Sequence, residues 1–408
     1  MKILHLMSTP YGGAANAALR LHLGLRNMGV ESNVLTIGTR NDISNIYSVA
    51  DISRWGWIKN PLIKKKAKHF YFNTLRLFEG KTFNPEKFTL PTSPYKIENH
   101  PLVKEADIIN LHWVSEFVNV PTFFENINKP IVWTLHDMNT FTGGCHYTFE
   151  CLGFINGACA KCPQLKGVEK PDLANSNFEI KQKSYANKNI TIVTPSKWLC
   201  GESQKSSLTN LFEKRIIPYG LPDSVFYPYC KKEARNQLNL PSDKKLILFV
   251  ADSINNYRKG IKYIIEASKL LNTEYLFLLV GVGNYEARNF IQLGEIKDET
   301  KMAQIYSTAD LFVIPSLADN LPNTVLESLF CGTPVVGFNI GGIPDMVEDA
   351  VNGFICDETD AKKLALTIQK GLDFGFDRIE ISKKAQEKYS LKRQTESYIE
   401  LYNNLLQM

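Results

Sequence analysis

The sequence predicts an α/β protein of two domains, each built on a doubly wound parallel sheet. Three observations predict this class. The chain has 408 residues, which is more than one hydrophobic core ordinarily serves. Short apolar runs rich in β-branched residues alternate with helical segments, and this series occurs twice along the chain. Between the two series lies a Pro- and Gly-rich segment, residues 215–228, which is typical of an interdomain linker.

Composition and charge are those of an ordinary globular chain. Hydrophobic residues make up 44% and charged residues 22% of the sequence, and no run of eighteen apolar residues occurs. The N-terminal MKILHLM continues into a glycine turn, which indicates a first strand and not a signal peptide. We therefore expect a cytoplasmic protein with reduced cysteines. The net charge of +5 suits phosphate ligands or an anionic membrane surface and does not require nucleic acid.

The first domain opens with a strand over residues 2–7, a turn into a helix that reaches Leu25, and a strand over 33–37. The turn contains Gly12 and Gly13, which let a backbone approach a ligand closely. A plain tight turn between strand and helix would explain the same two glycines.

Residues 51–78 interleave two Trp, a run of Lys and several other aromatic residues. A basic segment with Trp and Phe can lie in a membrane interface, so this segment is a candidate for transient contact with the inner face of a membrane. The alternative is a solvated basic face on an insertion in the first domain. No helix-turn-helix or single-strand-binding pattern accompanies the charge, which argues against nucleic acid as a partner.

Two further apolar runs, 107–113 and 130–135, are expected to be strands, and a histidine lies at the end of each. These are His112 and His136. The carboxyl ends of parallel strands form the ligand-binding edge of such a sheet. A lone histidine after a strand is more often structural, but the Asp137 that follows makes His136 the stronger candidate for a functional residue.

Residues 140–165 contain four cysteines: Cys145, Cys151, Cys159 and Cys162. Four cysteines within eighteen residues, in a reducing compartment, predict a structural zinc site. The first pair is too widely spaced for the usual paired CxxC pattern, and His146 could replace one ligand. The alternative is a cluster of free or reversibly oxidised thiols.

The next segments lead into the second domain. Residues 191–198 predict a strand and a helix start capped by Ser196. After the linker, strands are expected over 244–250 and 275–280, with a loop and a helix after the first of them. The loop ends in Arg258 and Lys259.

Residues 307–348 predict a strand over 311–314, a loop, a helix that starts at Pro322 and ends near Gly332, and a strand over 333–337. This segment places Asp319 in the loop and Glu327 on the helix.

The chemistry of the segment follows from its order. The first-turn amides near Asn323 and Thr324 lie between the two carboxylates and have no partner within the helix, so they form an anion site. Carboxylates at both ends suit hydroxyl groups, and the amides suit phosphate. A nucleotide sugar combines those groups. A generic helix with a capping Asp319 and a surface Glu327 is the alternative.

This segment resembles the donor-site motif of the retaining GT-B glycosyltransferases of family four, in which two acids flank seven residues. Both acids are usually Glu in that family, whereas the first acid here is Asp319. The resemblance implies that Glu327 holds ribose hydroxyls and Asp319 holds hydroxyls of the donor sugar.

Other turns resemble the same family. Gly12 and Gly13 match its glycine turn near the donor phosphates, and the Thr-x-His-Asp turn implies a sugar contact by His136. Lys259 matches the lysine of its diphosphate clamp. The usual arginine position holds Ile254, and Arg258 is the nearest substitute. A similar Cys-rich loop occurs in related exopolysaccharide enzymes of the colanic-acid type.

The resemblance implies a GT-B fold of two Rossmann-like domains facing a cleft. Residues 1–217 would form the acceptor-side domain, 218–389 the nucleotide-sugar donor domain, and a terminal helix at about 390–408 would pack back on the first. The implied activity is retaining, metal-independent hexosyl transfer from a nucleotide-diphosphate sugar to a saccharide or lipid-linked acceptor in cell-surface polysaccharide synthesis. No cofactor is implied for catalysis.

Two other classes of protein remain open from the sequence. A GT-B-like epimerase would use the same cleft without an acceptor, and a phosphorylase would need pyridoxal phosphate on a lysine for which no strong motif is visible. A sugar-nucleotide-binding scaffold would bind the donor without turnover. Asp319 in place of Glu, and Ile254 in place of Arg, favour the scaffold slightly.

Overall fold

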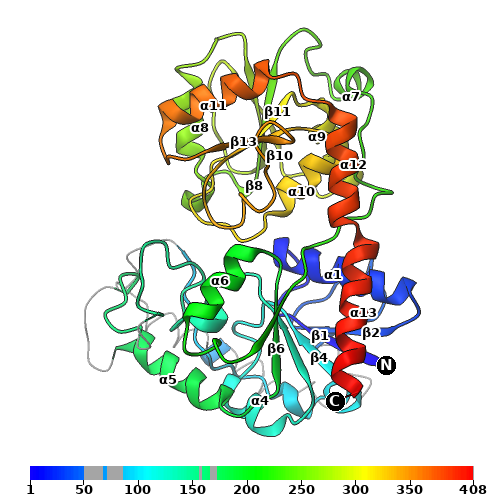
Figure 1. Cartoon of the computed structure of the whole chain (residues 1–408), viewed down its shortest axis with the longest axis vertical. Coiled ribbons are helices and arrows are strands. Elements are labelled where there is room, and N and C mark those ends of the chain that lie inside the picture. Colours follow the sequence, from blue (N-terminus) through cyan, green and yellow to red (C-terminus); the bar gives the residue numbers. More distant parts are fainter. Residues whose placement is uncertain (50–67, 71–85, 156–158, 166–171, 408) are drawn as a thin grey trace. The chain divides into compact units, whose positions relative to one another are not determined.

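A computed structural model of the chain describes residues 1–49, 68–70, 86–155, 159–165 and 172–407 (Figure 1). These residues form two compact units, Met1–Ile217 together with Thr395–Met408, and Pro218–Gln394. The candidate membrane segment 51–78 lies outside the described residues except for 68–70. Within the described part of the chain, no helix is both long and apolar enough to cross a lipid bilayer.

The first unit is built on a seven-stranded sheet in the order β3-β2-β1-β4-β5-β6-β7, and every pairing in it is parallel. The predicted strands are confirmed to within three residues at each end. The central strands are buried on both faces, as a parallel sheet covered by helices requires. The strands are β1 (Lys2–Leu6), β2 (Glu31–Thr36), β3 (Ile46–Ser48), β4 (Ile108–Leu111), β5 (Ile131–Thr134), β6 (Ile190–Thr194) and β7 (Glu213–Ile216).

The helices of the first unit follow these strands in the chain. As predicted, Ser196 caps one of them, because its Oγ accepts the Leu199 amide at 3.0 Å. The described helices are α1 (Gly13–Asn27), α3 (Pro101–Glu105), α4 (Val120–Asn126), α5 (Leu173–Tyr185) and α6 (Lys197–Lys205), with short 3₁₀ turns η2 (Ile97–Asn99) and η3 (Asn139–Phe141).

The C-terminal helix α13 (Leu391–Gln407) contributes to the core of the first unit. Tyr398 and Tyr402 are fully buried and share a cluster with residues of β1, β4 and β5. The Tyr398 hydroxyl lies 2.9 Å from Thr134 Oγ1, and the Tyr402 hydroxyl accepts the Asn110 amide at 2.7 Å. The helix is therefore fixed by both apolar burial and buried hydrogen bonds.

The second unit is built on a six-stranded parallel sheet in the order β10-β9-β8-β11-β12-β13. Its central strands are buried runs of Leu, Ile, Val and Phe that pack in one cluster with α8 and α11. The strands are β8 (Leu246–Ser253), β9 (Leu276–Val282), β10 (Phe290–Gly294), β11 (Leu311–Ile314), β12 (Val335–Phe338) and β13 (Gly353–Cys356).

The described helices of the second unit include the predicted helix of the donor-like segment, with one correction. Pro322 has an extended ψ of 120° and is the N-cap, so the helix starts at Asn323 and not at Pro322. The proline ring fixes the φ of Pro322 at a value that a helix also allows, but its extended ψ keeps this residue in the loop. The helices are α7 (Lys231–Gln237), α8 (Ile261–Ser268), α9 (Glu299–Thr308), α10 (Asn323–Phe330), α11 (Ala361–Asp373) and α12 (Arg378–Tyr389), with a 3₁₀ turn η4 (Tyr257–Lys259).

Candidate functional site

The strand order of the second unit reverses between β8 and β11, and ligands bind doubly wound sheets at the carboxyl ends of such strands. The loops that follow these two strands contact each other there. The Leu317 amide donates to the Arg258 carbonyl at 2.7 Å, and Arg258 Nη1 donates to the Ala318 carbonyl at 2.7 Å. Gly260 has φ of 72°, and a Cβ on it would lie 1.9 Å from the Pro315 carbonyl oxygen. Only glycine permits this approach.

Asp319 and two cations meet at this position. Lys259 Nζ lies 2.7 Å and Arg258 Nη1 lies 3.5 Å from Asp319 Oδ2, and Asp319 is only 7% exposed. Burial raises the pKa of Asp319, but the positive charges of Lys259 and Arg258 outweigh it and hold that pKa below its usual value. The structure therefore brings together the predicted sugar-binding acid and both predicted phosphate-binding cations.

Gly341 and Gly342, which follow β12, lie against the backbone carbonyl of Asp319. The Gly342 amide donates to the Asp319 carbonyl at 3.1 Å. Gly341 has φ of 59°, and a Cβ there would lie 1.8 Å from the same oxygen. Local sequence marks these two glycines only as a turn after the strand predicted over 333–337.

Glu327 lies on α10, the helix that follows the loop of Asp319. It is half-buried, and the hydroxyl of the fully buried Tyr306 donates to its Oε2 at 3.0 Å. At the start of the same helix, Asn323 and Thr324 are half-buried, and the N-cap residue Pro322 has no polar side chain with which to cap the turn. The anion site at these first-turn amides stays a prediction. Tyr306 was missed, because its position on α9 gives no sequence signal of a contact 21 residues away.

In the first unit, Gly12 and Gly13 lie exposed at the start of α1, after β1. Gly12 has φ of 96°, which L side chains rarely adopt. His136 follows β5 and hydrogen-bonds through Nε2 to Nδ1 of His112 at 3.1 Å. The stronger and the weaker of the two predicted histidines are therefore direct neighbours.

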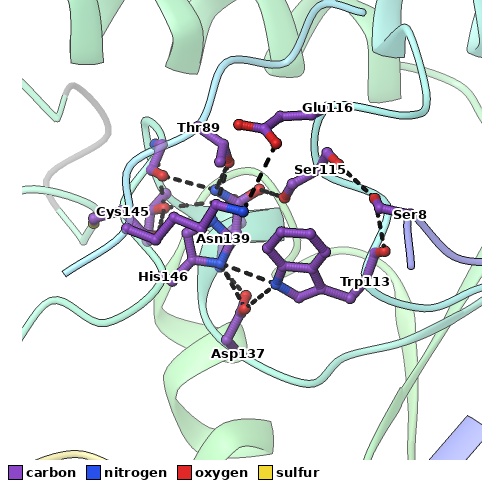
Figure 2. A network of polar contacts seen from close by, with 12 residues as sticks. Ser8, Thr89, Trp113, Ser115, Glu116, Asp137, Asn139, Cys145 and His146 are labelled. Carbon is purple, nitrogen blue, oxygen red and sulfur yellow. Dashed lines mark hydrogen bonds and ion pairs between the residues drawn. The ribbon is translucent and has the colours of Figure 1, made fainter. Parts of the chain in front are cut away.

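Asp137 belongs to a separate network, shown in Figure 2. Its Oδ2 lies 2.6 Å from His146 Nδ1 and accepts the Trp113 indole N–H at 2.8 Å, and its Oδ1 accepts the Asn139 amide at 2.9 Å. Burial raises the pKa of Asp137, but His146 and these hydrogen bonds together hold it below its usual value.

The other ring nitrogen of His146, Nε2, lies 3.0 Å from Thr89 Oγ1. Both nitrogens of His146 are therefore engaged with oxygen atoms of the protein. A zinc site that uses His146 in place of a cysteine stays a prediction, and it would require one of these two contacts to break. The network ties the strand ends of β4 and β5 to the Cys-rich loop (Figure 2).

The four cysteines of that loop carry free thiols, two of them buried and two half-buried. Burial raises the pKa of Cys145 above its usual range and that of Cys159 to about 11. The backbone N–H of Gly143 donates to Cys159 Sγ at 3.2 Å. Among the described residues, no three His, Cys, Asp or Glu side chains are grouped so that they could hold a metal ion.

Zinc binding by Cys145, Cys151, Cys159 and Cys162 stays a prediction of the sequence. Because a thiolate is the ligand, binding would release protons that the buried thiols otherwise retain. Protein purified without chelator is expected to contain about one zinc per chain by mass spectrometry of the metal. Metal-free protein in which all eight thiols of the chain react with a thiol reagent after unfolding would support the thiol alternative.

Comparison with known proteins relates this chain to glycosyltransferases. The family model described as glycosyl transferases group 1 matches residues 231–388. MJ1607, an uncharacterized glycosyltransferase of Methanocaldococcus jannaschii, is 27% identical over 43% of this chain and 48% of its own length. WcaC of Escherichia coli K12, named for colanic acid biosynthesis as a glycosyl transferase, is 24% identical over 97% of both chains.

Among solved structures, Anabaena Alr3699/HepE in complex with UDP-glucose has a TM-score of 0.67 at 14% identity, covering 99% of this chain and 100% of that one. Together with the two parallel-sheet units, this likeness confirms the predicted fold class. The chain therefore has the GT-B fold, and its second unit carries the region that the glycosyl transferases group 1 model matches.

Proposed function

We propose that this chain is a retaining glycosyltransferase. It would move a sugar from a nucleotide-diphosphate sugar to a saccharide or lipid-linked acceptor in cell-surface polysaccharide synthesis. The observation that carries the proposal is the cluster of Asp319, Lys259 and Arg258 at the strand-order reversal of the second unit. The match of residues 231–388 and the names of the relatives support the reaction class.

The proposed roles follow from the chemistry of each group. Glu327 accepts hydrogen bonds from ribose hydroxyls, and Asp319 accepts them from the donor sugar. Lys259, Arg258 and the first-turn amides of α10 stabilise the charge that develops on the departing diphosphate. His136 hydrogen-bonds the sugar. Because two cations and a helix N-terminus supply positive charge, we propose that the transfer needs no metal ion.

The first test is a thermal-shift panel with UDP, GDP, ADP and their common sugars. A ligand that binds only the folded state stabilises by about 2.7 kcal/mol at a hundredfold excess over Kd. We expect one nucleotide family to raise the melting temperature of the wild type. The exposed Glu266→Gln variant on α8 should respond in the same way, and Glu327→Ala should not.

Turnover separates the enzyme from the scaffold. Release of nucleoside diphosphate from the stabilising donor, with retention at the anomeric carbon of the product, would support the transferase. A donor that stabilises the chain but is never consumed with any saccharide or lipid-linked acceptor would favour the binding scaffold. Consumption without an acceptor, yielding an isomeric donor, would favour the epimerase.

A further inference from the structure

Three histidines form a continuous hydrogen-bonded chain across the first unit. His5 lies on β1, and His112 and His136 follow the neighbouring strands β4 and β5. His5 Nδ1 is 2.8 Å from His112 Nε2, and His112 Nδ1 is 3.1 Å from His136 Nε2. The chain crosses the point where the strand order of this sheet reverses, between β1 and β4. Its outer member is the histidine for which we propose a sugar contact.

All three rings are neutral at physiological pH. Burial is the main cause that holds the pKa of His5 and of His112 well below the usual range. Neighbouring histidines lower these pKa values further: His22 for His5, and His5 and His136 for His112. Burial also lowers the pKa of His136 to about 4, against the opposing effect of Asp137. A neutral imidazole carries one proton, so one ring nitrogen donates and the other accepts.

Each link needs one donor and one acceptor, so the chain has two proton arrangements. In the first, His5 Nδ1–H donates to His112, His112 Nδ1–H donates to His136 Nε2, and the proton of His136 is on Nδ1. In the second arrangement every bond is reversed, and the proton of His136 is on Nε2. The arrangement therefore decides whether His136 Nδ1 is a donor or an acceptor.

The far end of the chain distinguishes the two arrangements. His5 is fully buried, and its Nε2 has no hydrogen-bond partner among the described residues. The first arrangement leaves a bare lone pair there, and the second leaves an N–H. Orphaned buried N–H groups are the rarer and costlier case in proteins. The first arrangement is therefore favoured.

The neighbouring His22 does not supply the missing partner. Its Nε2 lies 3.1 Å from the Ser44 carbonyl, which can only accept, so the proton of His22 is on Nε2. Its Nδ1 lies 2.7 Å from Ser32 Oγ and accepts the hydroxyl proton. The rings of His22 and His5 meet edge to face, with centroids 6.1 Å apart. Both nitrogens of His22 are thus used elsewhere.

We propose that His5 and His112 are positioning residues that hold His136 in the tautomer with its proton on Nδ1, so that a ligand oxygen in contact with this nitrogen would accept a hydrogen bond from it. This inference rests on the proposed function for the identity of that ligand, a nucleotide-diphosphate sugar with acceptor oxygens on its hydroxyl and phosphate groups. The tautomer itself is a property of the ligand-free chain.

Nitrogen-15 NMR of histidine-labelled full-length protein tests the tautomer directly. The chain has seven histidines, and the His136→Gln spectrum identifies the ring in question. At pH 7.5 without donor, we expect His136 Nδ1 to show the shift of a protonated nitrogen and Nε2 that of a bare one. A protonated Nε2 on His136 would overturn the inference, whatever the transfer assay shows.

Two substitutions of His5 test the positioning. The side-chain amide of Asn places an N–H donor where Nδ1 was, so His5→Asn should keep the His136 tautomer and near-wild-type transfer. His5→Leu removes the N–H group and should give a mixture of His136 tautomers. We expect kcat/KM for the nucleotide sugar to fall about tenfold, because this corresponds to the loss of one hydrogen bond. Wild-type tautomer and transfer in a folded His5→Leu protein would overturn the positioning role.

The two proposals fail in different ways. If the wild type consumes no nucleotide sugar but His136 carries its proton on Nδ1, the proposed function fails and the tautomer assignment stands. If the wild type turns over and His136 carries its proton on Nε2, the assignment fails and the function stands. Should His5→Leu not fold, the wild-type and His5→Asn spectra still decide the tautomer.

Discussion

Replacing Glu327 by Ala is expected to lower kcat/KM for the nucleotide sugar by about 100- to 10,000-fold. Two hydrogen bonds from ribose hydroxyls to a carboxylate contribute about 1.5–3 kcal/mol each, and 1.4 kcal/mol is a factor of ten. The fold should survive, because the Glu327 side chain is half-buried and Ala is a good helix former within α10. Full transfer by Glu327→Ala would contradict the donor-site assignment.

Two further variants separate charge from packing at this position. Glu327→Gln keeps an acceptor for Tyr306 but removes the charge, so its transfer rate should fall between those of the wild type and Glu327→Ala. Tyr306→Phe keeps the carboxylate and removes one hydrogen bond that orients it, which costs about 1 kcal/mol or about fivefold in kcat/KM. Steady-state kinetics with one donor and circular dichroism melts give both comparisons.

Replacing Lys259 by Met should lower kcat by about 100- to 1,000-fold, as removal of one stabilising group at a developing charge commonly does. The structure adds a second consequence. Lys259 is the nearer of the two cations at the buried carboxylate of Asp319, at 2.7 Å. Without it, that carboxylate is left with Arg258 as its charged partner, and we expect a loss of about 1–3 kcal/mol in unfolding free energy.

The pH dependence of that loss has a defined sign. The pKa of Asp319 is held below its unfolded value, so its ionised form stabilises the wild type above that unfolded value. This contribution is lost as the pH falls through the lowered folded pKa. In Lys259→Met the folded pKa rises towards the unfolded value, so the contribution is smaller and its loss is complete at a higher pH. Urea unfolding between pH 3 and pH 7 should show the shift.

The double variant Lys259→Met with Asp319→Asn is the matched control. It removes the buried charge together with its partner, so most of the lost stability should return, while transfer should stay impaired. A double variant that recovers transfer as well as stability would show that Lys259 acts only on Asp319 and not on the diphosphate.

The order of elements and the donor-like segment could be predicted from local sequence. The apolar run Leu311–Ile314 predicts a strand, and the structure has a strand there. Helix α10 starts one residue later than predicted, because a proline can serve as either N-cap or first helical residue. Parallel strands that are buried on both faces are almost continuous apolar runs, so this class of fold can be predicted from a single sequence.

The partners of the chemical groups could not be predicted in this way. The position of His146 beside Cys145 in the sequence indicates a shared metal site. In the structure, His146 contacts Asp137 and Thr89, and Thr89 lies 57 residues away in the chain. The sequence likewise predicts that Lys259 and Asp319 each contact the nucleotide sugar and gives no sign that they contact each other. Only the folded loops show that they are paired with each other.

The sequence by itself thus determined two doubly wound domains, the acids at 319 and 327, the cations at 258 and 259, and the histidine after β5. Tertiary structure decided which of these groups touch, and it added Tyr306, Gly341 and His5 to them. The physical reason is the range of each interaction. Secondary structure follows from neighbours a few residues apart, whereas His5 and His112 meet across 107 residues of chain, where sheet order alone brings them together.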